Sequence, residues 1–293
     1  MKKLTAFLLI LAGSFFSCEK EDNNPENFRL LKVFNYASST SANPTDGVEY
    51  TYDETGNMVK ESFYSYRPTT ALYMYFEYEY SGNKKMNMKL FRESSGTFRL
   101  NWRIDYFYEG DHLFKEEHRE ADGFLSISTY YEYKDGNLIR EYSDKAGYGI
   151  SDEIKYTYDY LNRLILEENT TSDVDDYKYI KYIYDSLGRK IKLEYYNMNW
   201  ELIRYVEKVY GGRSKLPVKD LHYNKDGTQT LQYQHFYDHL GNLTETIYNN
   251  ECSLFKRKYN RGLLIEEIRY LDPSKKRGCL EDVMLRYEYE KLK

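Results

Sequence analysis

Ten tyrosines recur along this chain at a nearly constant interval of about 26 residues, and each closes a similar short phrase. They are Tyr52, Tyr80, Tyr108, Tyr133, Tyr158, Tyr184, Tyr210, Tyr237, Tyr259 and Tyr289. A fixed period of this length is typical of repeat proteins, in which one small unit stacks on its own copies. The period constrains the architecture far more than the chemistry.

The residues before each recurring tyrosine alternate in character. Positions two and four residues earlier are mostly aromatic or aliphatic, and the positions between them are mostly polar, as in Phe76-Glu77-Tyr78-Glu79-Tyr80. This alternation predicts a strand with one packed face. Three units depart from the pattern, because Lys208, His235 and Arg257 stand two residues before the recurring tyrosine. We therefore expect a strand to end at each recurring tyrosine.

A turn should follow each of these strands. Asp185-Ser186-Leu187-Gly188-Arg189 shows the pattern, in which Asp can accept a backbone N–H two residues on and Gly supplies the positive φ. Apolar residues then resume, as in Leu164-Ile165, which predicts a return strand and hence a β-hairpin. The array should hold about twenty strands in about ten units. It starts mid-unit, since residues 29–33 read as a return strand without its partner.

The predicted fold is all-β. No long stretch has helical apolar spacing, and Tyr makes up 35 of 293 residues. Twenty strands spaced about 4.8 Å apart would span roughly 100 Å if the sheet stayed open, and strand twist would coil it. We therefore expect a long coiled antiparallel meander, or spiral sheet, of repeated hairpins. Pro217, which lacks a ladder donor, predicts a bulge, bend or edge in its unit.

The phrase Tyr-x-Tyr-Asp-x-x-Gly-Asn/Arg-Leu-Ile-x-Glu resembles the YD repeat, also called the Rhs-like repeat. Matching segments are Tyr50 to Glu61, Tyr156 to Glu167 and Tyr182 to Glu194. The resemblance covers nearly all of residues 28–293. It implies hairpin units that wind into a spiral sheet, and the long members of the family form hollow shells around a C-terminal toxin. With few repeats and an end at Lys293, this chain is not expected to form a closed, cargo-holding shell.

The first residues resemble a targeting sequence. Lys2 and Lys3 precede an apolar stretch, so residues 1–17 are predicted to be a signal peptide, too short to span a membrane. Phe15-Phe16-Ser17-Cys18 resembles a bacterial lipobox, which implies a lipid anchor on Cys18 and a polar tether over residues 18–27. The lysine and acids after Cys18 resemble the surface-export signal of Bacteroidetes lipoproteins. We expect an outer-membrane, surface-exposed lipoprotein, with a periplasm-facing one as the alternative.

Charge and cysteine content limit the partners. The formal net charge is −5 and no basic block is present, which argues against binding nucleic acid. An oxidising compartment would permit a disulfide between Cys252 and Cys279, although two reduced, buried thiols remain the alternative.

Catalytic and metal motifs are hard to find. His235 and His239 bracket Asp238, but residues four apart in a strand lie about 13 Å apart, too far to share a metal ion. The aspartates that follow recurring tyrosines repeat with the unit, which a turn-closing role predicts and a catalytic pair does not. We expect no metal, no cofactor and no enzymatic activity.

Aromatic residues are the remaining candidates for a binding site. The recurring tyrosines should pack on one face as the core, with their hydroxyls reaching water at the edge of the sheet. Other aromatics have the opposite parity, and in an extended groove they could stack on sugar rings or anchor a protein. A second packed face is the alternative explanation. These residues are Tyr73, Tyr75, Phe107, Tyr130, Tyr179, Tyr205 and Phe236.

The favoured function is therefore a non-catalytic binding or adhesion scaffold for an extracellular protein or glycan. An extracellular polysaccharide-processing enzyme, with carboxylates gathered in a groove of the sheet, is the alternative. Two acids about 5–10 Å apart in a pocket would favour the enzyme. A third possibility is a simple spacer.

Overall fold

A computed structural model of the chain describes residues 28–170, 177–249, 251–270 and 281–291. These residues form one antiparallel sheet of 20 strands, and no helix occurs among them. The strands are β1 (Phe28–Tyr36), β2 (Asp46–Tyr52), β3 (Met58–Ser65), β4 (Ala71–Ser81), β5 (Lys84–Ser94), β6 (Thr97–Glu109), β7 (His112–Glu120), β8 (Leu125–Lys134), β9 (Asn137–Lys145), β10 (Gly149–Tyr158), β11 (Leu164–Asn169), β12 (Tyr179–Tyr184), β13 (Lys190–Tyr196), β14 (Leu202–Tyr210), β15 (Pro217–Asn224), β16 (Gln229–Tyr237), β17 (Leu243–Tyr248), β18 (Cys252–Asn260), β19 (Leu263–Tyr270) and β20 (Glu281–Lys291).

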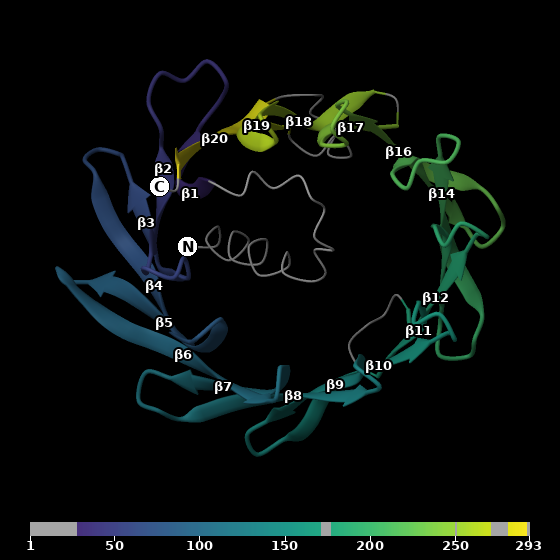
Figure 1. The fold of residues 1–293 in the computed structure, drawn as a ribbon, viewed down its shortest axis with the longest axis horizontal. Coiled ribbons are helices and arrows are strands. Elements are labelled where there is room, and N and C mark those ends of the chain that lie inside the picture. Colours follow the sequence, from purple (N-terminus) through teal and green to yellow (C-terminus); the bar gives the residue numbers. More distant parts are fainter. Residues whose placement is uncertain (1–27, 171–176, 250, 271–280, 292–293) are drawn as a thin grey trace.

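The sheet closes on itself. Each strand pairs with the next along the chain, and β1 also pairs with β20, from Phe28↔Lys291 to Tyr36↔Met284. Figure 1 shows the resulting ring, in which the first and last strands lie side by side. The predictions of an all-β hairpin array and of about twenty strands are confirmed. The predicted antiparallel meander is also confirmed, but it closes into a ring and does not form a spiral, because the two ends of the sheet are hydrogen-bonded to each other.

The closing pair completes a repeat unit. β20 is a forward strand that ends near Tyr289, and β1 is the return strand that the sequence left without a partner. Val33 on β1 lies opposite Tyr287 on β20 and opposite Val48 on β2. The closing pair thus has the same forward-and-return arrangement as every other hairpin.

A bulge recurs directly before the last tyrosine of each forward strand. Register shifts occur at Thr51/Tyr52, Thr157/Tyr158 and Val209/Tyr210, and the other hairpins closed by a recurring tyrosine repeat them. The bulge expected near Pro217 is present, since Pro217 pairs with Tyr210. It is a general feature of the repeat and not a defect of that unit, and bulges strengthen local twist.

The wall of the ring has two faces. The tyrosine face carries the recurring tyrosines, and its core cluster is Phe63, Met74 and Leu90. The opposite face carries residues of the other parity, such as Phe107. Side chains on the concave side of a closed sheet converge and bury one another. Leu90 is 0% exposed, whereas Phe107 is 36% exposed, so we infer that the tyrosine face is the inner one.

The tyrosine hydroxyls tie neighbouring hairpins together. The Tyr184 hydroxyl donates to the Leu164 carbonyl at 2.8 Å, and Leu164 is the residue paired with Tyr158 at the preceding bulge. Tyr52 donates to Leu30, so the pattern continues across the closing pair. The expectation that these hydroxyls reach water is wrong for the following seven tyrosines, because each bonds to a backbone carbonyl: Tyr52, Tyr158, Tyr184, Tyr210, Tyr237, Tyr259 and Tyr289.

Candidate functional site

The aspartates after the recurring tyrosines close turns. Asp185 Oδ1 accepts the N–H groups of Leu187 and Arg189 at 2.9 Å each, and Gly188 has φ +76°. Asp53, Asp159 and Asp238 make the same two kinds of bond. Their role in the turn matches the prediction, and the repeated acids are occupied by backbone donors.

The inner face carries buried charge beside the tyrosines. Tyr78 donates to Glu61 at 2.9 Å and Tyr182 donates to Glu167 at 2.6 Å. Burial raises the pKa of Glu61 and lowers the pKa of Lys85, despite the favourable interaction between the two charges. These groups lie within the wall, where the tyrosine–glutamate hydrogen bonds connect neighbouring strands.

The units that lack the first tyrosine replace it with ion pairs. Lys208 Nζ lies 2.8 and 2.9 Å from the two Asp220 oxygens, and His235 Nε2 lies 3.6 Å from Asp220 Oδ2. In the next such unit Arg257 pairs with Glu267, which is 2% exposed. The departures from the repeat seen in the sequence are therefore compensated locally, and they do not by themselves indicate a ligand site.

Four pairs of aromatic rings on the opposite face or at its rim are stacked with their centroids no more than 5.0 Å apart. Tyr75 stacks on Phe91 with ring centroids 4.8 Å apart, and Tyr205 stacks on Tyr223 at the same distance. The other two pairs are Tyr130 with Tyr142 at 5.0 Å and Tyr179 with Trp200 at 3.9 Å. In the first three pairs the stacked rings belong to residues directly opposite on neighbouring strands, where cross-strand contact is closest.

A cation accompanies three of these pairs. Lys60 Nζ lies 3.8 Å from the Tyr75 ring centroid, and Lys192 Nζ lies 4.1 Å from that of Tyr205. Arg140 lies 4.3 Å from the Tyr142 ring centroid. The opposite face therefore combines flat apolar rings with charged groups, an arrangement that can contact both the faces and the hydroxyls of sugars or the side chains of a protein.

The predicted ligand-binding residues divide into two groups. Tyr75, Tyr130, Tyr179 and Tyr205 belong to the stacked pairs. The rings of Phe107 and Phe114 are tilted, 6.5 Å apart; Tyr73 contacts Phe63 and is 42% exposed, and Phe236 is 38% exposed. Their role in binding stays a prediction. Sequence reasoning missed Trp200, which is half exposed in the turn between β13 and β14, although a tryptophan directly after Asn197-Met198-Asn199 was a usable signal.

Sequence reasoning also missed a cavity of about 210 Å³ between β6, β7 and the start of β8. It is lined by Trp102, Arg103, His118, Arg119, Glu120, Ser126 and Ile127. A register shift at His118/Arg119 interrupts the alternation of the two faces there. Consecutive residues of each strand line the cavity, so both parities contribute, and parity alone could not have grouped them.

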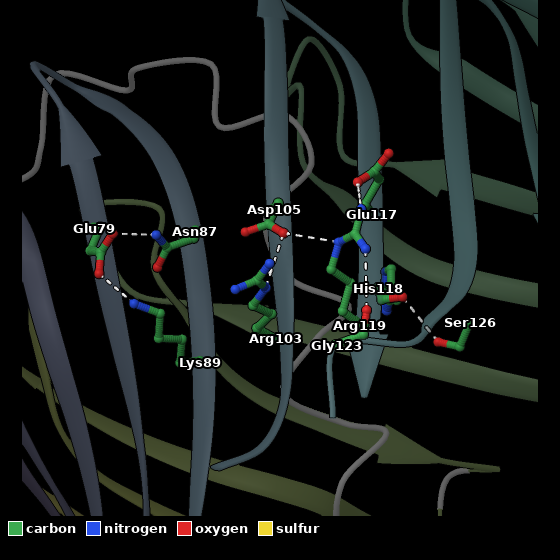
Figure 2. Close-up of polar contacts among 10 residues, drawn as sticks. All are labelled: Glu79, Asn87, Lys89, Arg103, Asp105, Glu117, His118, Arg119, Gly123 and Ser126. Atoms are coloured by element: carbon green, nitrogen blue, oxygen red, sulfur yellow. Dashed lines mark hydrogen bonds and ion pairs between the residues drawn. The ribbon is translucent and has the colours of Figure 1, made fainter. Parts of the chain in front are cut away.

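Beside the cavity, charged residues form a network on β4 to β7. Asp105 Oδ2 lies 3.2 Å from Arg103 Nε and 3.5 Å from Arg119 Nε, while Glu79 binds Lys89 at 2.6 Å. Arg119 also pairs with Glu117 and donates to the Gly123 carbonyl at 3.2 Å. Figure 2 shows two separate groups of contacts, one of Glu79 with Asn87 and Lys89, and one in which Arg119 connects Asp105, Glu117 and Gly123.

The cysteines and histidines of the described residues do not indicate a catalytic or metal site. Cys252 is buried and disulfide-bonded, whereas Cys279 and Cys18 lie outside the described residues, so the Cys252–Cys279 pairing stays a prediction. His235 Nδ1 is 3.0 Å from the Thr246 hydroxyl. Within the described ranges no group of three or more His, Cys, Asp or Glu residues is arranged to hold a metal ion. The same part of the chain has no helix of the length and hydropathy that a membrane span requires.

Comparison with known proteins gives distant structural likenesses only. No family model matches the chain, and no curated protein matches it. A TcdB2–TccC3 structure is 13% identical over 78% of this chain, with a TM-score of 0.47, and the chain spans only 14% of that structure's length. A porin-like protein from Bacteroides uniformis is 12% identical, covering 89% of this chain and 96% of its own, with a TM-score of 0.34. At these TM-scores the likenesses carry no argument about this chain.

Proposed function

We propose that the chain is an outer-membrane lipoprotein, exposed at the cell surface, that binds an extracellular glycan or protein without chemical turnover. In this proposal residues 1–17 are removed, Cys18 carries the lipid and residues 18–27 form the tether. An anchor of this kind attaches a folded domain to the membrane surface. The ring of residues 28–291 would then present its outer face to the surroundings.

The observation that supports binding is the set of stacked aromatic pairs on the outer face. Rings that are half-buried and held parallel by a cross-strand partner lose little freedom when a ligand stacks on them. The lysines and arginine beside three of the pairs supply donors for hydroxyl or carboxylate groups. A glycan fits this combination best, because a sugar offers an apolar ring face together with many hydroxyls.

The enzyme alternative gains no comparable support. The cavity between β6 and β8 has one carboxylate in its lining, Glu120, whereas hydrolysis by paired carboxylates needs two. The repeated aspartates are bound to turn N–H groups. Assays for polysaccharide cleavage remain the direct test of this alternative.

Glycan arrays and pull-downs with residues 28–293 would test the proposal. We expect Tyr205→Ala, which removes one ring of a stacked pair, to weaken binding of any retained glycan by about tenfold, as loss of one stacking contact does. Tyr160→Ala is the matched control, since Tyr160 is 91% exposed at a turn and belongs to no stacked pair. If no glycan or protein partner is retained by the wild type, the proposed function is wrong.

A further inference from the structure

Three cations lie side by side on neighbouring strands next to the cavity. Lys89 on β5 is directly opposite Arg103 on β6, and Arg103 is directly opposite Arg119 on β7. Like charges at such positions, about 5 Å apart, destabilise a sheet unless anions lie between them. This row therefore needs compensating negative charge.

The compensation within the protein is incomplete. Lys89 forms a separate pair with Glu79 and lies opposite Glu77. Arg103, Lys115 and Arg119 are joined by ion pairs to two carboxylates, because Asp105 is shared by the two arginines and Glu117 is shared by Lys115 and Arg119. Three cations in this group are therefore ion-paired with two carboxylates.

Arg103 is the least satisfied member. Arg119 has three polar partners, but the only polar contact of the Arg103 guanidinium within the described residues is its ion pair with Asp105. Its Nε is buried and makes no hydrogen bond, and no hydrogen bond of its terminal Nη1 and Nη2 groups occurs within the described residues. A guanidinium with free terminal nitrogens is suited to bidentate binding of a carboxylate or sulfate.

The cavity beside Arg103 offers other contacts that a sugar needs. The Glu120 carboxylate and the Ser126 hydroxyl line it and can bond to hydroxyl groups. A volume of about 210 Å³ is below the roughly 300–1,000 Å³ of sites that enclose drug-sized ligands. It therefore suits a single ring or the end of a chain.

We propose that this cavity binds an anionic sugar residue, whose carboxylate or sulfate bonds to Arg103. The inference rests on the proposed function and specifies its ligand as an acidic glycan. Binding would add a negative charge beside Arg103 and Arg119, so the site should prefer anionic over neutral glycans.

Calorimetric titration of the full chain can test this with three probes of equal length: a uronic-acid oligosaccharide, its carboxyl-reduced neutral counterpart, and a sulfated form of that neutral counterpart. We expect at least one anionic probe to bind at least tenfold more tightly than the neutral one. Arg103→Gln should abolish the preference, and Arg103→Lys, which keeps the charge but not the fork, should restore it in part. Arg99→Gln is the matched control on the same strand, because it removes an exposed charge outside the cavity.

The outcomes separate the two proposals. Equal affinity for neutral and anionic probes, or an unchanged preference in a folded Arg103→Gln protein, would overturn the acidic-sugar site and leave the binding function standing. Absence of any glycan or protein partner would overturn both. Melting temperatures of all three variants, compared with wild type, establish that they are folded before affinities are interpreted.

Discussion

At the scale of single residues, seven of the ten recurring tyrosines connect neighbouring hairpins through their hydroxyl groups. Each of these hydroxyls donates to the carbonyl of the residue that pairs with the preceding tyrosine, as Tyr184 does with Leu164 and Tyr210 with Lys190. An unpaired carbonyl within the wall would be costly, because buried backbone groups need partners. The tyrosine is therefore kept for its hydroxyl as well as for its ring.

Tyr184→Phe tests the hydroxyl. The ring stays and the 2.8 Å bond to the Leu164 carbonyl is lost, so we expect a loss of about 1 kcal/mol in the free energy of unfolding. Urea denaturation followed by circular dichroism would measure it. Tyr160→Phe, at an exposed turn position, should change nothing measurable. Equal stability of wild type and Tyr184→Phe would show that the bond contributes nothing net.

Two glutamates on opposite faces should respond to pH with opposite signs. Burial raises the pKa of Glu61, so its charged form is disfavoured in the folded state and stability falls as the pH rises through that raised value. The hydrogen bonds and charge of Lys89, with Asn87, lower the pKa of Glu79, so its contribution is present above the ordinary glutamate pKa and is lost as the pH falls through the lowered value.

Glu61→Gln should accordingly be more stable than wild type at pH 7, within about 1 kcal/mol, and the difference should vanish below pH about 4. Glu79→Gln should be less stable at pH 7, by under about 1 kcal/mol, and that difference should also vanish in acid. Denaturant titrations of both variants at several pH values provide the measurement. If both substitutions changed the free energy of unfolding in the same direction at pH 7, the result would contradict the placement of Glu61 in a buried site and of Glu79 in an ion pair.

At the scale of the hairpin, the sequence predicted those features that depend on residues close together in the chain. The Asp-x-x-Gly turn predicted the bonds of Asp185 and the positive φ of Gly188, because both depend on residues within one phrase. The bulge before each tyrosine was not predicted. It depends on register between two strands, and an extra residue in one strand leaves no distinctive mark on the alternating pattern.

Gly188→Ala tests the turn. Gly188 has φ +76° and open space around its missing side chain, so the substitution adds no clash and only forces a left-handed conformation on alanine. We expect a loss of about 1 kcal/mol in the free energy of unfolding. Gly211→Ala is the control, since its φ is not positive and a methyl group would meet Val218 at an ordinary 3.7 Å. Equal effects of the two substitutions would rule out φ as the cause.

At the scale of the whole molecule, closure is the property that sequence reasoning missed. Residues 29–33 read as a return strand without a partner, and the last forward strand near Tyr289 equally lacked one, so the two half-units were complementary. The repeat pattern alone could not show that they meet, because closure depends on the accumulated twist and tilt of all the strands. The cavity on β6 to β8 was missed for a related reason, since it depends on how three neighbouring strands are placed and not on the pattern within one strand.

A circular permutant tests closure directly. Phe28 and Lys291 are ladder partners in the ring, so a Gly/Ser linker of about six residues can join them without strain. The chain can then begin at Gly227, in the exposed turn between β15 and β16. We expect this permutant to fold with the wild-type circular dichroism spectrum and with similar stability, because every strand keeps both neighbours.

A permutant that begins at Gln234, inside β16, is the control and should fail to fold, since the new chain ends would divide a strand. In an open sheet the ends would lie far apart and the linker would prevent folding, so an unfolded Gly227 permutant would argue against the closed ring.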